Sequence, residues 1–92
     1  MLDIVYSKQF KTDFKKIKND TKAKQCLQEV LSILANGQEL QSKYRPHALT
    51  GNYSNYMECH IKPDLLLIYR IKNDELVLYL LRIGSHSALF QK

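Results

Sequence analysis

The sequence feature that most constrains the fold is a change in the spacing of apolar residues near position 53. Over residues 7–37 they recur every three or four positions, the spacing of a helix that buries one face. From residue 53 onward they alternate, as in a β-strand. A chain of 92 residues holds one core, so the two patterns must pack together. We predict a single α+β domain spanning residues 1–92.

The N-terminal part predicts a strand followed by two helices. Residues 2–6 are rich in β-forming side chains, and Ser7 can cap a helix whose apolar face begins at Phe10. The "NDT" sequence at 19–21 breaks that helix and caps a second one, which Gly37 ends. Helices joined this closely should form an antiparallel hairpin covering one face of a twisted sheet.

The C-terminal part predicts an antiparallel meander, and its three strands are expected at 53–62, 65–71 and 75–83. The almost continuously apolar "LLLIYRI" at 65–71 should be the central strand. Pro63-Asp64 and Asn73-Asp74 suit the connecting turns. Residues 38–52 show few regular repeats and are interpreted as a long loop, a kind of segment that often carries function.

Charge and cysteine content narrow the functional classes. The formal net charge of +5 favours phosphate-bearing or acidic partners. We expect a cytoplasmic protein without a membrane partner, since no apolar run approaches the roughly 18 residues of a membrane span and no signal-peptide pattern is present. Cys26 and Cys59 lack metal-ligand spacing and are expected to be reduced.

Histidine is the side chain best suited to proton transfer near neutral pH, and the chain has three: His47, His60 and His86. They lack the close pairing of a zinc site, so we expect no metal and no cofactor. Each could be an independent surface residue. If they converge at one end of the sheet, however, they could support acid–base chemistry on a phosphodiester.

Metal-free RNA cleavage needs a base for the 2′-hydroxyl, an acid for the leaving 5′-oxygen and a cation for the transition-state charge. These roles could be filled by His60 with Glu58 and Asp64, by His86, and by Arg82. Glu58 and His60 share a strand face, which could equally be a plain polar edge. Arg82 falls by alternation among leucines, either as a frayed strand end or as a phosphate ligand. In the second case Arg82→Ala should leave folding nearly intact.

Further RNA contacts are suggested by charge and aromaticity. Lys43, Arg45 and Lys62 could hold RNA phosphates. The helix lysines could do the same, although a solvated helix face would carry them too. Phe90 could stack on a base or complete the core.

Three stretches carry a family resemblance: "HALTGNY" at 47–53, "ECHIKPDLLLIYRI" at 58–71 and "LRIGSHSALF" at 81–90. In order and spacing they resemble the YafQ branch of the RelE/ParE toxin superfamily, whereas the N-terminal half agrees only in its strand–helix–helix plan. The resemblance implies a RelE-like fold and a ribosome-dependent mRNA endonuclease that needs no metal. It also implies contact with ribosomal RNA and a DinJ-like antitoxin as partner.

The resemblance further implies an active site composed of His47, His60, Asp64, Arg82, His86 and Phe90, with Glu58 as a contributor. His86 would be the general acid and His60 or Asp64 the general base. Arg82 would clamp the transition state and Phe90 would orient the mRNA. Leu65 and Met57 depart from the Trp and Arg often found at these family positions, which bears on sequence preference and potency more than on reaction type.

Two other functional classes are considered. One is a non-enzymatic growth inhibitor of the ParE type, whose effect would persist without His60 and His86. The other is a basic interaction domain that binds RNA in a salt-sensitive way without cutting it.

Overall fold

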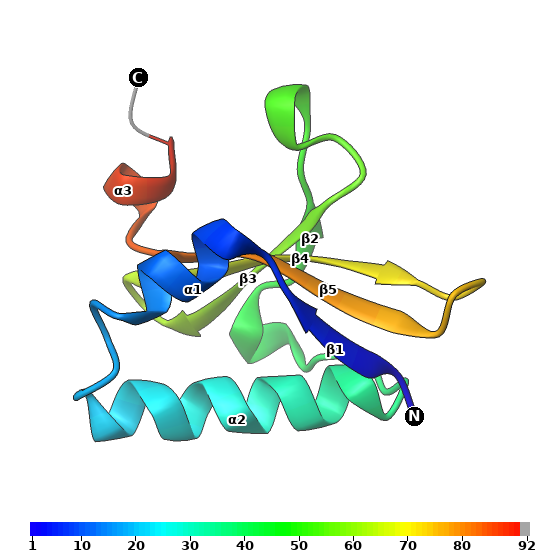
Figure 1. The fold of residues 1–92 in the computed structure, drawn as a ribbon, viewed down its shortest axis with the longest axis horizontal. Coiled ribbons are helices and arrows are strands. Elements are labelled where there is room, and N and C mark those ends of the chain that lie inside the picture. Colours follow the sequence, from blue (N-terminus) through cyan, green and yellow to red (C-terminus); the bar gives the residue numbers. More distant parts are fainter. Residues whose placement is uncertain (91–92) are drawn as a thin grey trace.

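The computed structural model describes residues 1–90 and shows a twisted sheet with α2 along one face and α3 on the opposite side (Figure 1). The strands are β1 (Asp3–Tyr6), β2 (His47–Ala48), β3 (Met57–Lys62), β4 (Leu65–Lys72) and β5 (Val77–Gly84). The helices are α1 (Lys8–Phe14), α2 (Thr21–Ala35) and α3 (His86–Phe90), with 3-10 turns η1 (Ser42–Tyr44) and η2 (Gly51–Tyr53). The predicted α+β class and the meander are confirmed.

The strand order is β1-β5-β4-β3-β2, and the sheet is mixed. The meander pairs are antiparallel, whereas β1 runs parallel to β5. Parallel neighbours need a long connection, and here the helices and the first meander strands separate the two. The pattern of residues 38–52 gave no sign of the edge strand β2, which pairs with β3.

Both main helices begin at the predicted caps. The Ser7 hydroxyl accepts a hydrogen bond from the Phe10 amide at 2.8 Å, and the Asp20 carboxylate accepts one from the Ala23 amide at 3.0 Å. Gly37, with a left-handed φ of 73°, follows α2 as a stop signal. Within residues 1–90, no helix combines the length and apolarity that crossing a bilayer would require.

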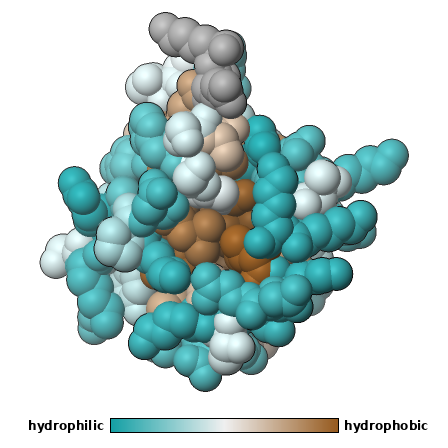
Figure 2. All heavy atoms as spheres, turned by 90° about the vertical axis from the view of Figure 1, so that its left-hand side faces the viewer, coloured by the Kyte–Doolittle hydropathy of each residue, from teal (hydrophilic) through white to brown (hydrophobic). Residues whose placement is uncertain are grey.

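The main core lies between the helices and one sheet face. Its buried residues include Phe10 from α1, Leu27 and Val30 from α2, and Leu67 and Leu78 from the sheet. Since both helices contribute, the prediction of a helical layer on one face is confirmed. Figure 2 shows an edge of the molecule where apolar atoms remain visible inside a frame of hydrophilic side chains. Both cysteines are free, as expected.

A second, smaller cluster lies on the opposite sheet face, and we call it the open-face cluster. Its buried members are Leu66, Ile68 and Leu89, packed against partly buried Leu49, Tyr53, Tyr56, Leu81 and Phe90. α3, which sequence analysis did not predict, supplies two of these residues. Tyr53, the first residue of the strand expected at 53–62, belongs to η2 and packs in this cluster instead. Leu66 and Ile68 therefore form an apolar floor on this face of the sheet.

Candidate active site

A β-bulge decides where Arg82 points. Strict alternation would place Arg82 beside Leu80 in the main core. In the ladder, Ile68 pairs with Arg82 and the next β4 residue pairs with Leu80, which leaves Leu81 as an extra residue. One extra residue inverts the alternation that follows it. Ile83 accordingly takes the buried core position, at 2% exposure, and Arg82 lies on the same face as Ile68.

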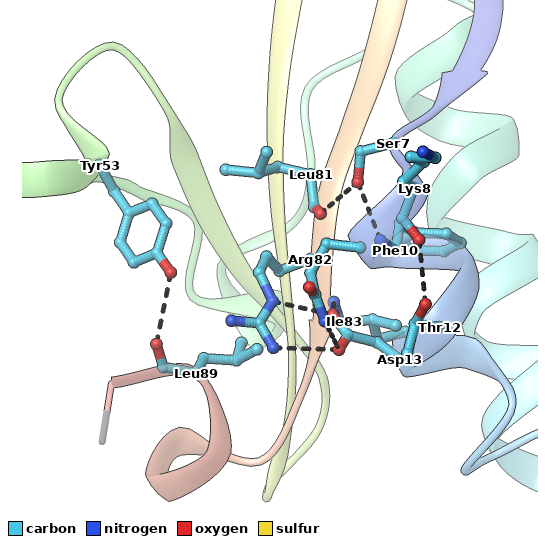
Figure 3. Close-up of polar contacts among 11 residues, drawn as sticks. Ser7, Lys8, Phe10, Thr12, Asp13, Tyr53, Leu81, Arg82, Ile83 and Leu89 are labelled. Atoms are coloured by element: carbon cyan, nitrogen blue, oxygen red, sulfur yellow. Dashed lines mark hydrogen bonds and ion pairs between the residues drawn. The ribbon is translucent and has the colours of Figure 1, made fainter. Parts of the chain in front are cut away.

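Arg82 is held by Asp13 of α1 (Figure 3). Its Nε donates to Asp13 Oδ2 and its Nη2 donates to Asp13 Oδ1, each at 3.0 Å. β1 pairs with β5 only as far as Leu80, so the later backbone groups of β5 are open to α1. The Ile83 amide donates to Asp13 at 3.1 Å, and the Leu81 carbonyl accepts from the Ser7 hydroxyl. Ser7 and Asp13 thus satisfy the backbone groups of β5 that lie beyond its pairing with β1.

Sequence analysis missed Asp13, although a carboxylate among the phenylalanines of an apolar helix face was a signal. Burial by itself would raise the pKa of Asp13, but hydrogen bonds from Arg82, Gln9 and Ile83 outweigh burial and hold that pKa below its ordinary value. The pKa of Arg82 is raised, chiefly by its hydrogen bond to Asp13 and less by the Tyr53 hydroxyl. The structure does not support the expectation that Arg82 is dispensable for folding.

The sheet register aligns the predicted site residues in two adjacent rows. In the first row, His47 pairs with Glu58, Glu58 with Ile68, and Ile68 with Arg82. Strands lie about 4.8 Å apart, so the backbones of His47 and Arg82 are about 14 Å apart. A histidine and an arginine therefore flank one stretch of apolar floor.

The second row pairs His60 with Leu66 and Leu66 with Gly84. The chain then enters α3, which begins at His86. A Cβ on Gly84 would stand 3.3 Å from Leu89 Cδ2, so glycine lets α3 approach the strand closely. Gly84 is the last residue of β5, and its lack of a side chain allows close packing. His60 and the start of α3 thus lie toward opposite sides of Leu66.

His47 and Glu58 form a pair in which both imidazole nitrogens face acceptors. His47 Nε2 lies 3.1 Å from Glu58 Oε1, and Nδ1 lies 3.0 Å from the Arg45 carbonyl oxygen. The Glu58 side chain is only 6% exposed, compared with 51% for His47. A protonated imidazole can donate to both acceptors at once. A protonated His47 would therefore satisfy the buried carboxylate and be balanced by its charge.

His60 and Asp64 have different environments. His60 Nδ1 lies 3.4 Å from the Pro63 carbonyl oxygen. A carbonyl only accepts, so this contact places the proton on Nδ1 and leaves the Nε2 lone pair available. Asp64 is exposed in the turn after β3. The geometry therefore suits His60 better than Asp64 for accepting a proton from substrate.

His86 and Phe90 lie one turn apart on α3. Their ring centroids are 4.9 Å apart, and Phe90 makes an edge-on contact with Tyr53 at 5.6 Å. The Tyr53 hydroxyl also points toward the Leu89 carbonyl (Figure 3). Phe90 is therefore packed in the open-face cluster and partly exposed, and its contact with an RNA base stays a prediction.

The three predicted RNA-binding cations share a hollow with His60. Lys43, Arg45 and Lys62 all line it. Lys62 pairs with Asp20 at 3.5 Å, a partly exposed contact that contributes little to stability. The Lys43 ammonium lies 5.1 Å from the Tyr44 ring centroid. In the part of the chain that the structure describes, no three His, Cys, Asp or Glu side chains are grouped closely enough to hold a metal ion.

This fold, with its last strand leading into a short histidine-bearing helix, is that of bacterial toxins from type II toxin–antitoxin systems. The chain belongs to the YafQ family, because the family model described as "Bacterial toxin of type II toxin-antitoxin system, YafQ" matches residues 2–91. The resemblance found in the second half of the sequence is thus confirmed, and it extends through the N-terminal half.

Relatives span the whole chain. The mRNA interferase toxin YafQ of Escherichia coli strain K12 is 35% identical over 89 residues, covering 96% of this chain and 95% of that protein. A metal-bound toxin from Helicobacter pylori is 48% identical, with a TM-score of 0.86 and coverage of 98% and 100%. YafQ in the E. coli DinJ–YafQ complex is 34% identical, with a TM-score of 0.84 and coverage of 98% and 99%.

Proposed function

We propose that this toxin is an mRNA interferase that cuts ribosome-bound mRNA by acid–base catalysis, without a metal ion or cofactor. The observation that carries the proposal is the pair of rows across the sheet. His60 and Arg82 flank the Leu66–Ile68 floor, and His86 follows at the end of the second row. Family membership and the name of the E. coli relative support the same activity.

In the proposed reaction, the 2′-hydroxyl oxygen attacks the adjacent phosphorus and the bond from phosphorus to the 5′-oxygen breaks. His60 Nε2 accepts the 2′-hydroxyl proton, and His86 donates a proton to the leaving 5′-oxygen. The products are a 2′,3′-cyclic phosphate and a 5′-hydroxyl. Asp64 lies four residues from His60 and remains the alternative base.

Negative charge that builds on the phosphate needs a preorganised cation. Asp13 binds Nε and Nη2 of Arg82, which leaves Nη1 for the phosphate oxygens. When protonated, His47 adds a second cationic donor in the same row, with Glu58 holding it in place and balancing its charge. Because both cations are held by carboxylates on rigid elements, little reorganisation is required during the reaction.

Substrate placement involves the aromatic and basic residues around the floor. Phe90, braced by Tyr53, would stack on a base and orient the mRNA. Lys43, Arg45 and Lys62 would guide the phosphates, or ribosomal RNA, past His60. Such contacts carry charge and shape but little sequence information.

We also propose that a DinJ-like antitoxin neutralises the toxin and that the cytoplasm, where ribosomes translate, is its place of action. E. coli YafQ has been crystallised with DinJ. An acidic antitoxin segment would complement the net charge of +5.

The test is cleavage of mRNA on translating ribosomes by the wild type, His86→Ala and, as control, Ser87→Ala, which alters an exposed neighbour on α3. We expect cleavage by the wild type and the control, and its loss in His86→Ala. Intact mRNA with the wild type would refute the proposal. Growth arrest that survives His60→Ala and His86→Ala together would indicate the non-enzymatic inhibitor instead.

A further inference from the structure

The open sheet face carries a second aromatic and basic group, farther along the strands than the proposed active site. We call it the tyrosine strip, and it consists of Tyr56, Arg70, Lys72 and Tyr79. Arg70 pairs with Tyr79 across the β4–β5 ladder, so their side chains share a face. The Tyr56 and Tyr79 ring centroids are 6.5 Å apart, and Lys72 Nζ lies 5.5 Å from the Tyr79 ring centroid. All four residues are partly exposed.

The strip borders the same open-face cluster as the proposed catalytic residues. Tyr56 packs in the open-face cluster together with Tyr53 and Phe90, and Phe90 reaches the His86 ring at 4.9 Å. The strip and the proposed general acid are therefore linked through the same apolar cluster, which Tyr56 and Phe90 both contact. Along β5, Tyr79 precedes Arg82 by three residues, about 10 Å of strand.

The charges of the strip are available to a ligand. The ion pairs found within residues 1–90 involve Asp13, Asp20 and Glu58, and neither Arg70 nor Lys72 takes part in them. Arg70 is therefore free of a carboxylate in this part of the chain, and Lys72 is engaged with the Tyr79 ring rather than with an acidic group. Aromatic rings combined with cations form the surface that binds single-stranded nucleic acid, with bases stacked on rings and phosphates held by charge.

We propose that the tyrosine strip binds a nucleotide of the mRNA that flanks the cleaved bond. Its base stacks on Tyr79 and Tyr56, and its phosphate is held by Arg70 and by Lys72, which moves from the Tyr79 ring to the phosphate. This inference rests on the proposed mRNA interferase activity and adds a subsite to it. Because stacking tolerates every base, the subsite strengthens binding more than it selects sequence.

The first experiment measures cleavage of ribosome-bound mRNA at a series of toxin concentrations. Tyr79→Leu should raise the half-saturating concentration about tenfold, as loss of one stacked base does, and should leave the maximal rate unchanged. Tyr6→Leu is the control, because Tyr6 is an exposed aromatic on β1 outside the strip. An unchanged half-saturation for Tyr79→Leu, or an equal rise for Tyr6→Leu, overturns the inference.

The second experiment reports binding without cleavage. The chain contains no tryptophan, so Tyr79→Trp in a His86→Ala background creates a single fluorescent reporter. A short single-stranded RNA should quench it, and quenching should weaken with salt. Tyr6→Trp in the same background should not respond. Quenching by purified antitoxin but not by RNA would make the strip a protein contact and overturn the inference.

The two experiments separate failure of the subsite from failure of the proposed activity. If the wild type leaves ribosome-bound mRNA intact while RNA quenches the Tyr79→Trp reporter, the subsite stands and the nuclease proposal falls. If cleavage is absent and the reporter is unquenched, both fall. If the wild type cleaves ribosome-bound mRNA, the half-saturating concentration of Tyr79→Leu decides whether the subsite exists.

Discussion

Asp13 and Arg82 form a two-pronged ion pair, with both nitrogen–oxygen distances at 3.0 Å, that ties α1 to the strand leading into the proposed active site. Asp13 is 5% exposed, and it also accepts a hydrogen bond from the Ile83 amide. The same carboxylate thus holds a site residue and closes the edge of β5. Folding and activity are therefore coupled at this point.

Asp13→Ala should lower the free energy of unfolding by about 2 to 4 kcal/mol, because it leaves a guanidinium and a backbone amide without their acceptor. The loss should be smaller than for a fully buried pair, since 23% of the Arg82 side chain is exposed. Urea denaturation measures it. Gln9→Ala, which removes only a peripheral hydrogen bond to Asp13, is the control. A loss below about 1 kcal/mol for Asp13→Ala would show that the pair is dispensable.

The two roles of Arg82 can be separated by replacing both partners. Arg82→Ala alone should lose mRNA cleavage and stability together, because it leaves a buried carboxylate unpaired. The double variant Asp13→Leu with Arg82→Leu should recover part of the lost unfolding free energy, since an apolar pair needs no compensation, yet it should stay inactive. Recovery of cleavage in the double variant would show that Arg82 acts only through stability.

The pKa of Asp13 in the folded state lies below its ordinary value of 3.8. A group with a lowered folded pKa stabilises the fold above its unfolded pKa, and this stabilisation is lost as pH falls through the folded pKa. The free energy of unfolding should therefore decrease below about pH 4. Asp13→Asn should flatten this decrease in denaturation curves recorded from pH 6 to pH 3. An identical pH dependence in both proteins would assign it to other carboxylates, such as Asp20, whose pKa is also lowered.

The features that could be predicted from the sequence are those that depend on local residue spacing. Ser7 and the stretch 19–21 were identified as caps because a cap needs only a side-chain oxygen and the amide three residues later. Arg82 was misplaced because the extra residue at Leu81 inverts the alternation, and a bulge has no clear local signal. Its partner Asp13 lies 69 residues away, a separation that no periodicity spans.

The site residues, too, depend on contacts between distant parts of the chain that local spacing does not reveal. His47 and Glu58 were identified as candidates from residue type, strand spacing and family resemblance, but their contact depends on β2, a strand of only two residues. α3 has five residues, too few for a helical period to be detected. The site is thus built mainly from tertiary pairing, whereas the scaffold is encoded locally.

Glu58→Gln should lower the maximal cleavage rate about 100-fold, the usual effect of losing one preorganised charge or donor at the transition state. The amide keeps the shape of the side chain but cannot pair with a positive His47. Single-turnover cleavage on ribosomes, with thermal unfolding as a check, measures the effect. Glu75→Gln, in the exposed turn before β5, is the matched control. Equal rates for the two variants would remove Glu58 from the site.

Gly84→Ala should impair cleavage more than folding. The added Cβ would stand 3.3 Å from Leu89 Cδ2, so Leu89 must give way by a few tenths of an ångström, and we expect α3 and His86 at its start to move with it. Misplacing a catalytic group by about 1 Å can cost 100-fold in rate. Gly37→Ala is the opposite case: its Cβ meets nothing within 4 Å, but a left-handed φ of 73° should cost about 1 to 2 kcal/mol of unfolding free energy. Gly84→Ala should therefore show the larger loss of cleavage rate, and Gly37→Ala the larger loss of unfolding free energy in urea denaturation. A fully active Gly84→Ala would mean that the position of α3 does not control His86.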